Sequence, residues 1–495
     1  DSSTSRGLGD VYKRQLILTA LTSCNDWLDI NPRSQVKSDV LYDSEDGYKQ
    51  ALNGVYIKLA EGSLYGRNGM MQIPEFLARN WTVPAKATNL TNYSIANFDF
   101  TEKESEDAIS SLFAAYYSAI AQANDILANL KSNTSVRFQY NNDKLIEGEA
   151  LGLRAFLHLD VLRMWGPTPE EATASSEAIP YVNELSNDPS KLTSKTWNEV
   201  KTNIETDLTN AENILKEYDP VMYANMDSLN SLTHAGVYVG NGTMPKDDWQ
   251  MKRRSRFNYY AVLATKARFY HWVGDKEQAA KYAKLVVDPQ KIKLCTESMV
   301  ASSLTMYPEH IFGVENIDLL RIIQSDYLSS EALFTQKETS LKTAYESTVN
   351  TNDIRYANNR YWSSITYTNG ISVFTFYKFV GSDRVASDKR VPLLRMGEMY
   401  LILAEDLPTE QAKTYFSTYR VARGMQATID DTAYQSESEL LKRLELEYRK
   451  EFFGEGQMFY FYKKHNYAAY TWPSRYALPS KAYYIPKPKG QTNFE

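Results

Sequence analysis

The chain has 495 residues and a formal net charge of -6, with 43% hydrophobic and 23% charged residues. This composition is typical of a globular protein and excludes a chain that is disordered throughout. The acidic balance argues against a nucleic-acid-binding protein, which needs a basic surface. No run of eighteen apolar residues follows Cys24, so the sequence predicts no membrane span after that point.

The N-terminal segment has the order of a bacterial lipoprotein signal. Apolar residues 16–23 (LILTALTS) follow a basic pair at 13–14 and are too few to cross a membrane. The sequence LTSC, which ends at Cys24, resembles a lipobox, in which small side chains precede a cysteine that receives the lipid. We therefore predict that Cys24 is the lipid anchor, and the alternative is an ordinary buried cysteine.

The segment before Cys24 is interpreted as a leader. The first dozen residues are rich in Ser and Gly and contain no Met, so residues 1–23 are taken as a truncated or artefactual leader with a signal peptide. The other cysteine is Cys295, and acylation of Cys24 would leave it without a partner for an intrachain disulfide.

Apolar residues at helical spacing predict helices through most of the remaining chain. Residues 44–60 place Tyr48, Leu52 and Val55 on one face, with Ser44 as the predicted N-cap. Further amphipathic segments with helix-stop signals lie at 106–130, 143–165 and 196–217.

Two later segments, 261–287 and 393–424, each predict a pair of helices joined by a turn. The turns are at Gly274-Asp275 and at Leu407-Pro408. Small residues where paired helices cross allow a close approach, which is typical of tetratricopeptide hairpins. The sequence thus predicts a mainly α protein of tetratricopeptide-like hairpins with few short strands.

Three long segments lack helical periodicity: 61–100, 219–256 and 345–382. Loops of this length in a compact protein are functional or contain structure that the pattern does not reveal. Because loops carry much of the binding chemistry of such folds, we expect ligand contacts here.

Catalytic motifs are missing from the sequence. The five histidines are scattered without paired metal-ligand spacing, and His158 and His271, inside apolar helices, are expected to be packed rather than ligating. No GxSxG, Walker or GxGxxG motif occurs. We expect no catalytic residues, no metal and no cofactor.

Clustered carboxylates are the remaining candidates for catalysis. Glu447 and Glu451 are one helical turn apart beside Arg449 and Lys450, with Glu455 following. Structural ion pairs are favoured over the acid/base pair that a helical glycosidase would need.

Six sequence blocks in order resemble the SusD/RagB lipoproteins of Bacteroidota across nearly the whole chain from Cys24. The blocks are CNDWLDINP (24–32), GEALGLRAFLHLDVLRMWG (148–166), RRSRFNYYAVLATKARFYHWVGD (253–275), VPLLRMGEMYLILAED (391–406), EYRKEFFGEGQMFYFYKKH (447–465) and YALPSKAYYIPKP (476–488). One departure is Met458, where the family usually has Arg, so an altered buried polar network is expected there.

The resemblance implies a mostly helical, surface-exposed outer-membrane lipoprotein that binds a nutrient, commonly a glycan. Such proteins sit as a lid on a SusC-like TonB-dependent transporter. The chain is divided into an N-terminal part (24–218), a loop-rich insertion (219–256) and a C-terminal part (257–495), with the first and last forming one compact unit.

A sugar site needs an aromatic platform and hydrogen-bonding amide, carboxylate or guanidinium groups. The first and third long loops supply such residues, and the middle loop adds Trp249 and Asn241. The predicted ligand-binding residues are Arg67, Asn68, Arg79, Asn80, Trp81, Tyr93, Arg360, Tyr361 and Trp362. The alternative for each aromatic residue is packing of its loop onto the helical body.

The leading hypothesis is a glycan-binding lipoprotein that hands its ligand to a TonB-dependent transporter. The alternatives are a peptide- or other nutrient-binding lid of the RagB type, a helical glycoside hydrolase, and a scaffolding lipoprotein that binds only proteins. An array of glycans and peptides separates the first two, release of reducing sugar marks the third, and co-purification with a barrel without a small ligand marks the fourth.

Overall fold

The structure, a computed structural model, describes residues 41–186, 192–230, 244–328, 333–350, 352–366, 370–381, 387, 389–427 and 434–492. The predicted lipid anchor Cys24 and the loop residue Asn241 lie outside these residues. Cys295 is a buried free thiol, and burial raises its pKa.

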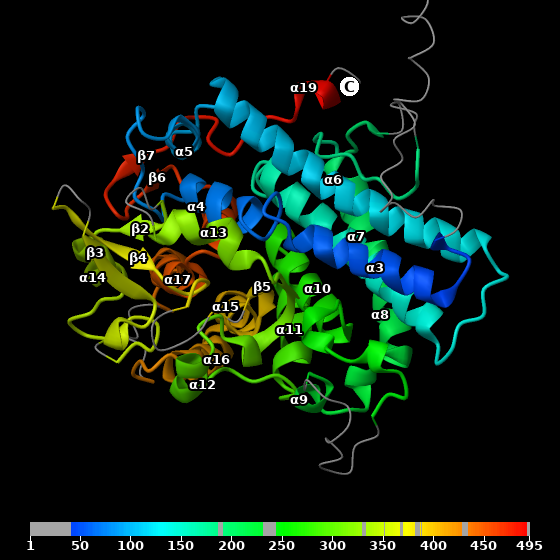
Figure 1. Cartoon of the computed structure of the whole chain (residues 1–495). Coiled ribbons are helices and arrows are strands. Elements are labelled where there is room, and N and C mark those ends of the chain that lie inside the picture. Colours follow the sequence, from blue (N-terminus) through cyan, green and yellow to red (C-terminus); the bar gives the residue numbers. More distant parts are fainter. Residues whose placement is uncertain are drawn as a thin grey trace, which may run out of the picture.

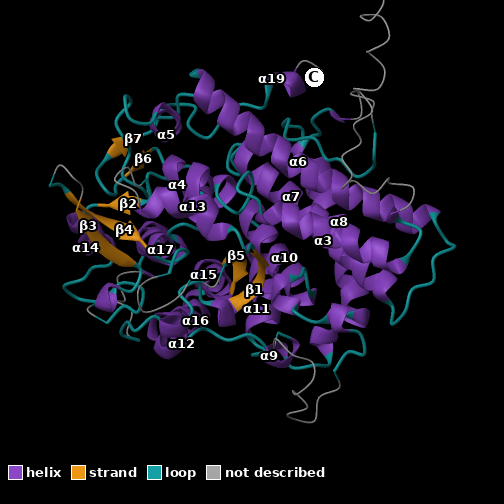
Figure 2. Cartoon of the chain, in the orientation of Figure 1, coloured by secondary structure: helices purple, strands orange, loops and turns teal. Residues whose placement is uncertain are grey.

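Helices make up most of the described chain (Figures 1 and 2). The α-helices are α3 (Glu45–Ala60), α4 (Ile73–Leu77), α5 (Leu90–Ala96), α6 (Lys103–Ser132), α7 (Asn142–Trp165), α8 (Trp197–Tyr218), α9 (Met226–Leu229), α10 (Tyr259–Val273), α11 (Lys276–Val287), α12 (Glu297–Ser302), α13 (Leu319–Leu328), α14 (Glu338–Ala344), α15 (Met396–Asp406), α16 (Thr409–Ala422), α17 (Glu437–Phe452), α18 (Gln457–Lys464) and α19 (Lys489–Thr492). The mainly α prediction is confirmed.

Short turns of other helix types and short strands complete the fold. The former are η1 (Asn68–Gln72), η3 (Pro220–Met222), η4 (Asp248–Gln250), η5 (Arg253–Ser255), η6 (Tyr307–Glu309) and η7 (Ala357–Asn359). The strands are β1 (His310–Glu315), β2 (Thr335–Gln336), β3 (Trp362–Thr366), β4 (Ser372–Phe376), β5 (Arg390–Arg395), β6 (Ala469–Tyr470) and β7 (Tyr476–Ala477).

Six pairings in the described chain join seven helices side by side in one continuous stack. Helix α6 packs on α7, α7 on α8, α8 on α10, α10 on α11, α11 on α15, and α15 on α16. Both predicted hairpins, α10–α11 and α15–α16, are present. Close approach of α8 to α7 depends on Gly148, because a Cβ there would lie 2.8 Å from the Leu215 side chain.

Local capping explains why the helices begin where the sequence predicts. The Ser44 hydroxyl accepts a hydrogen bond from the Gly47 backbone N–H at 3.2 Å, and Thr196 and Glu199 form a capping box at the start of α8. Gly274 ends α10 in the left-handed conformation, with φ of 84°, which favours glycine. These interactions satisfy backbone groups that a helix end leaves unpaired.

The strands form three small antiparallel sheets. Strand β1 pairs with β5 beside the helical stack, from His310 opposite Arg395 to Glu315 opposite Arg390. Strands β2, β4 and β3 form a second sheet at the left of Figure 1, and β6 pairs with β7. The segment 345–382, which lacks helical periodicity, therefore contains a hairpin of β3 and β4.

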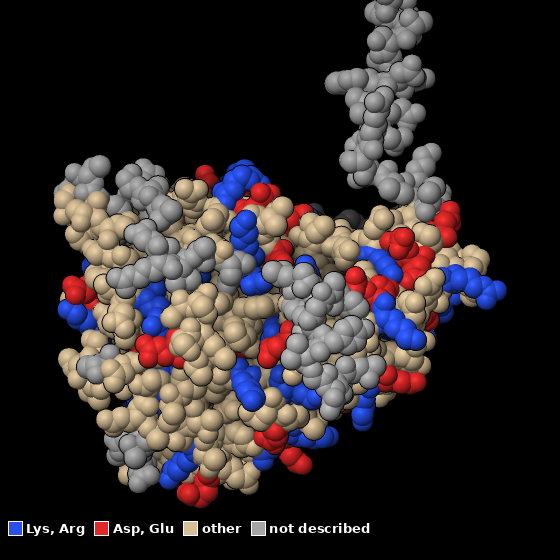
Figure 3. Space-filling model, turned by 60° about the horizontal axis from the view of Figure 1, so that its bottom comes forward, with Lys and Arg blue, Asp and Glu red and all other residues tan. Residues whose placement is uncertain are grey.

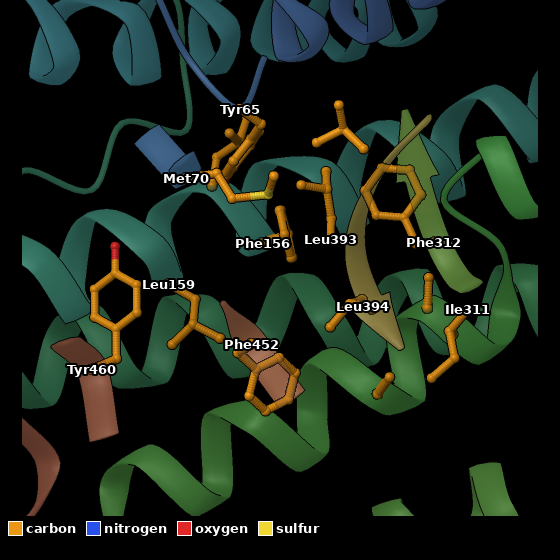
Figure 4. Packing of buried hydrophobic residues seen from close by; sticks show 14 of the residues in the cluster. Tyr65, Met70, Phe156, Leu159, Ile311, Phe312, Leu393, Leu394, Phe452 and Tyr460 are labelled. Carbon is orange, nitrogen blue, oxygen red and sulfur yellow. The ribbon is translucent and has the colours of Figure 1, made fainter. Parts of the chain in front are cut away.

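A continuous hydrophobic core joins helices from both ends of the chain. Figure 4 shows part of it, where Tyr65 and Phe156 from the first half lie near Phe312 and Leu394 of the small β1–β5 sheet. Helix α7 runs through this region and is buried along nearly its whole length. No helix in the described ranges combines the length and apolar character that crossing a membrane requires.

The clustered carboxylates of α17 lie in a buried ion-pair network, as the sequence predicts. Glu451 receives hydrogen bonds from Arg355, Arg395 and Arg423 at 2.6–3.0 Å. Glu447 pairs with Lys450 at 2.7 Å. The Arg partners come from distant segments, so this network ties α17 to β5, to α16 and to the segment before β3.

Candidate functional site

The predicted aromatic platform is buried. Trp81 and Trp362 are 0% exposed and Tyr361 is 1% exposed. The prediction that these rings form an exposed sugar-binding surface is therefore wrong for this structure. The alternative, packing of the loops onto the helical body, is what the structure shows.

The first and third long segments (61–100 and 345–382) meet through a cluster of aromatic rings in the interior of the protein. Trp81 stacks on Phe334 with ring centroids 5.1 Å apart and contacts Trp362 edge-on at 6.2 Å. Each indole N–H has a partner inside the protein: Trp81 donates to the Met71 carbonyl at 2.8 Å, and Trp362 donates to the Tyr345 hydroxyl at 3.2 Å. Satisfied indole groups make burial of these rings favourable.

Asn80 is also buried, and its side chain forms a hydrogen bond with the buried carboxyl group of Glu75. Its side-chain amide donates to Glu75 at 2.9 Å, and the Gly456 backbone N–H donates to the other Glu75 oxygen at 2.6 Å. Burial raises the pKa of Glu75 to about 8, although both hydrogen bonds act to lower it. Glu75 is therefore largely neutral near pH 7 in the folded protein.

Replacing Glu75 by Gln is expected to remove a pH-dependent loss of stability. A pKa raised from 4.5 to about 8 means that the folded state holds a proton that the unfolded state releases. Between these two pKa values the wild type therefore loses about 1.4 kcal/mol of stability for each pH unit of increase, and the Gln variant does not. Urea unfolding at pH 5, 7 and 9 measures this.

The exposed variant Glu410→Gln, whose side chain is 89% exposed, serves as control and should track the wild type at each pH. A constant difference between Glu75→Gln and wild type from pH 5 to pH 9 would contradict the assignment.

Two predicted arginines are engaged within the fold. Arg67 makes a bidentate ion pair with Asp326 at 2.7 and 2.9 Å and donates to the neighbouring Asn68 at 3.0 Å. Arg360 donates to the Ile354 carbonyl at 3.2 Å and pairs with Glu297 at 3.1 Å. Since Arg67 is 24% exposed and Arg360 is 11% exposed in their side chains, these groups mainly hold loops in place.

Arg79 and Tyr93 remain partly exposed on another surface. The Arg79 guanidinium lies 3.9 Å from the centroid of the Tyr476 ring and donates to the Ala96 carbonyl at 2.8 Å. Arg79 has a positive φ of 54°. Together with Tyr93 and Tyr476 it forms a half-exposed group, called here the Arg79 patch.

A surface cleft of about 560 Å³ surrounds Trp249, one of the aromatic residues that the sequence singles out. It is called here the Trp249 cleft, and it lies between α3, the segment around η4 and η5, and the end of β1. Its lining residues are Asn53, Tyr56, Ile57, Asp248, Trp249, Met251, Lys252, Ser255, Arg256, Val314 and Glu315. The walls combine aromatic, aliphatic, amide, hydroxyl and charged groups.

A buried ion-pair cluster fixes the position of the cleft wall. Arg253 pairs with Glu149 at 2.7 Å and with Asp219 at 2.8 Å, and Arg256 pairs with Glu149 at 3.1 Å. Burial alone would raise the pKa of Glu149, but Arg256 and Arg253 outweigh it and hold that pKa below its ordinary value. The two arginines thereby anchor the segment that carries Trp249.

Trp249 stacks against this anchored wall and is half-buried. The Arg256 guanidinium lies 3.6 Å from the centroid of its ring, and Lys49 lies 5.3 Å away. The indole N–H of Trp249 and one guanidinium nitrogen of Arg256 have no hydrogen-bond partner within the described part of the chain. Both atoms are themselves buried, so they stabilise the wall of the cleft and are not presented to a ligand.

Backbone strain marks the same wall. Lys252 has a left-handed conformation with φ of 56°, and its N–H donates to the Leu229 carbonyl at 2.6 Å. Residues with a β-carbon adopt this conformation at a cost in free energy, and such strained residues are often found at functional positions.

On the face of the molecule in Figure 3, acidic and basic side chains are interspersed.

Sequence reasoning found Trp249 but missed the rest of the cleft. Asn53 and Tyr56 belong to helix α3, whose pattern of apolar residues predicts packing against the core and gives no sign of a cleft. Glu315 ends a strand in the second half of the chain. The adjacent pair Asp248-Trp249 is the one local signal. The other wall residues come from segments whose proximity the sequence does not reveal.

Fold and site together define a helical-repeat protein with a mixed aromatic and polar surface cleft. A family model described as "SusD family" matches residues 175–493, and one described as "Starch-binding associating with outer membrane" matches residues 26–226. The chain belongs to the SusD family, as the six sequence blocks indicate.

Similar proteins agree with this assignment. The chain is 28% identical over 151 residues to SusD-like protein P25 of Formosa agariphila, a match that covers 30% of this chain and 28% of that protein. The match to SusD-like protein P38 of the same organism is 27% identical over 166 residues and covers 33% and 31%. This chain thus spans less than a third of either curated relative's length in these matches.

Solved structures resemble nearly the whole chain. A SusD superfamily protein from Bacteroides thetaiotaomicron has a TM-score of 0.68 at 18% identity, covering 90% of this chain and 97% of that one. A SusD-like carbohydrate binding protein from Bacteroides vulgatus has a TM-score of 0.67 at 17% identity, covering 91% and 96%. At these identities the likeness establishes the fold alone.

Proposed function

We propose that this protein binds a glycan at the cell surface and delivers it to a SusC-like TonB-dependent transporter. Membership of the SusD family supports the general role, and the description of one matching family model names starch binding and the outer membrane. The protein acts by capture without chemistry. Cys24 carries the lipid that holds it at the outer membrane.

The observation that carries the proposal is the chemistry of the Trp249 cleft. Its volume of about 560 Å³ is in the range of small-ligand sites. Ile57, which is 66% exposed, and the half-buried Trp249 offer apolar contacts for sugar C–H groups, while Asn53 and Asp248 are exposed polar groups for sugar hydroxyls. A cleft with these groups favours an oligosaccharide over a purely apolar ligand.

The glycan proposal is tested by affinity electrophoresis of the protein in gels that contain polysaccharides, together with an array of glycans and peptides. We expect at least one glycan class to retard the protein. Trp249→Ala should weaken the binding at least about tenfold, because buried aromatic contacts contribute about 2 kcal/mol. Tyr484→Ala removes a 56% exposed ring outside the cleft lining and should have no effect.

Other outcomes separate the remaining proposals. Loss of binding in Tyr476→Ala but not in Trp249→Ala would place the site at the Arg79 patch, which retains the predicted residues Arg79 and Tyr93. Binding of peptides without glycans would contradict the glycan proposal and support a RagB-type peptide lid. Release of reducing sugar by the pure protein would contradict capture without chemistry.

A further inference from the structure

A buried cluster of two imidazoles and two carboxylates lies where three helices end. His271 is in the last turn of α10, Glu405 and Asp406 end α15, and Lys464 and His465 lie at the end of α18. None of them lines the Trp249 cleft. Because the carboxyl end of a helix carries partial negative charge, three such ends in one place favour a cation.

The distances within the cluster are those of a metal site. One imidazole nitrogen of His271, Nε2, lies 3.6 Å from Oε2 of Glu405, and the other, Nδ1, lies 2.6 Å from Oδ2 of Asp406. Ligand atoms around a four-coordinate Zn²⁺ are about 3.4 Å apart, given bonds of about 2.0–2.2 Å. A carboxylate on the far nitrogen of a ligating histidine is the usual supporting arrangement.

Two carboxylate oxygens of the cluster lack a hydrogen-bond partner. Glu405 and Asp406 are each 8% exposed, yet Oε2 of Glu405 and Oδ1 of Asp406 have no hydrogen-bond partner in the described ranges. The other Glu405 oxygen, Oε1, is paired with His465 Nε2 at 3.2 Å. Unpaired buried polar atoms are costly, so their gathering at one point indicates a missing ligand.

The neighbouring cations do not balance all the negative charge of the cluster. Lys464 pairs with one oxygen of Glu405, whereas Asp406 is paired with the His271 imidazole. The two nearby arginines have their own partners: Arg268 pairs with Glu398 at 2.6 Å and Arg163 with Asp160 at 3.1 Å. A cavity of about 20 Å³ adjoins His271 and Lys464, enough for one water molecule.

We propose that this cluster binds a divalent transition-metal ion of the Zn²⁺ class. His271 through Nε2 and Glu405 through Oε2 are the two protein ligands, and water molecules complete the coordination. Asp406 orients His271 through Nδ1. Imidazole with carboxylate favours Zn²⁺ over Ca²⁺ or Mg²⁺, which prefer oxygen ligands alone. A bound ion joins the ends of α10 and α15.

The test is calorimetric titration of Zn²⁺ into the metal-stripped full chain without a histidine tag. We expect one equivalent to bind and to raise the melting temperature, with no effect of Ca²⁺. His271→Gln should abolish this binding, and Asp406→Asn should weaken it about 10- to 100-fold. Lys464→Met removes a competing cation and should tighten it, while the exposed control Glu410→Gln should match the wild type.

A second readout does not depend on how His271→Gln folds. Co²⁺ added to the wild-type protein should give the visible absorption of four-coordinate nitrogen and oxygen ligation, and Zn²⁺ should displace it. No stoichiometric Zn²⁺ binding, or equal affinity in wild type and a folded His271→Gln variant, would overturn the proposal. Since the cluster is separate from the cleft, loss of metal binding leaves the glycan test unaffected.

Discussion

Replacing Glu451 by Gln is expected to lower the free energy of unfolding by about 3–5 kcal/mol, the cost of breaking a buried charge network by removing one partner. Glu451 accepts hydrogen bonds from three arginine side chains and from the Tyr419 hydroxyl at 2.9 Å. With Gln, three buried guanidinium groups lose their shared anion. Urea unfolding at pH 7 measures the change.

Charge balance explains why this one position matters so much. The network contains five carboxylates and six cations with at most 5% exposed side chains: Glu309, Asp353, Glu447, Glu451 and Glu455 with Arg355, Arg395, Arg420, Arg423, Lys378 and Lys450. Glu437→Gln, with a 77% exposed carboxylate on the same helix, is the matched control and should change stability by less than about 0.5 kcal/mol. A loss below about 1 kcal/mol for Glu451→Gln would contradict this interpretation.

The same network predicts acid sensitivity. Burial would raise the pKa of Glu447, but Lys450 and Arg355 outweigh it and lower that pKa to about 2. A lowered carboxyl pKa contributes stability that is fully present above the ordinary value of 4.5 and is lost as the pH falls toward 2. Stability should therefore decline across that window, as urea unfolding at a series of pH values would measure.

Replacing Trp81 by Ala is expected to lower the free energy of unfolding by about 3–5 kcal/mol, as for other buried large-to-small aromatic changes. The ring is 0% exposed, stacks on Phe334 and donates a hydrogen bond to the Met71 carbonyl. Removing it leaves a cavity between the two loop segments and takes one hydrogen-bond donor from the Met71 carbonyl. The measurement is chemical unfolding, paired with glycan binding at a temperature where the variant is folded.

Measuring glycan binding by the Trp81 variants separates a packing role of this residue from a ligand-binding role. We expect folded Trp81→Ala to keep wild-type glycan affinity, because the ring cannot reach a ligand from the core. Trp81→Phe, which keeps an aromatic ring, should lose less stability. A variant of unchanged stability that no longer binds glycan would restore Trp81 as a platform residue.

Much of the helical architecture could be predicted because its signals are local. Ser44 caps its helix as predicted, the helix predicted from residue 196 begins at Trp197 with Thr196 as its cap, and Gly274 ends α10 at the predicted turn. The ion-pair interpretation of Glu447 and Glu451 also succeeded, since like charges one turn apart in a buried helix need cations. Lys450 pairs with Glu447 as its position in the sequence suggests, whereas Arg449 pairs with Glu445. The three arginines that hold Glu451 came from the structure alone.

The site was harder to predict because aromatic residues serve packing and binding equally well. Trp81 and Trp362 lie in segments without periodicity, and their burial depends on contact between loops far apart in the sequence. Trp249 differs because Arg253 and Arg256, paired to Glu149 and Asp219, hold its segment at the surface. No local pattern distinguishes these two outcomes.

Glycan capture at the Trp249 cleft is tested by measuring glycan binding of the full chain in the wild type, in Trp249→Ala and in the control Tyr484→Ala. We predict that at least one glycan class binds, that Trp249→Ala weakens binding at least about tenfold, and that Tyr484→Ala does not. Absence of binding to every glycan class, or equal binding by the wild type and Trp249→Ala, would contradict glycan capture at this cleft.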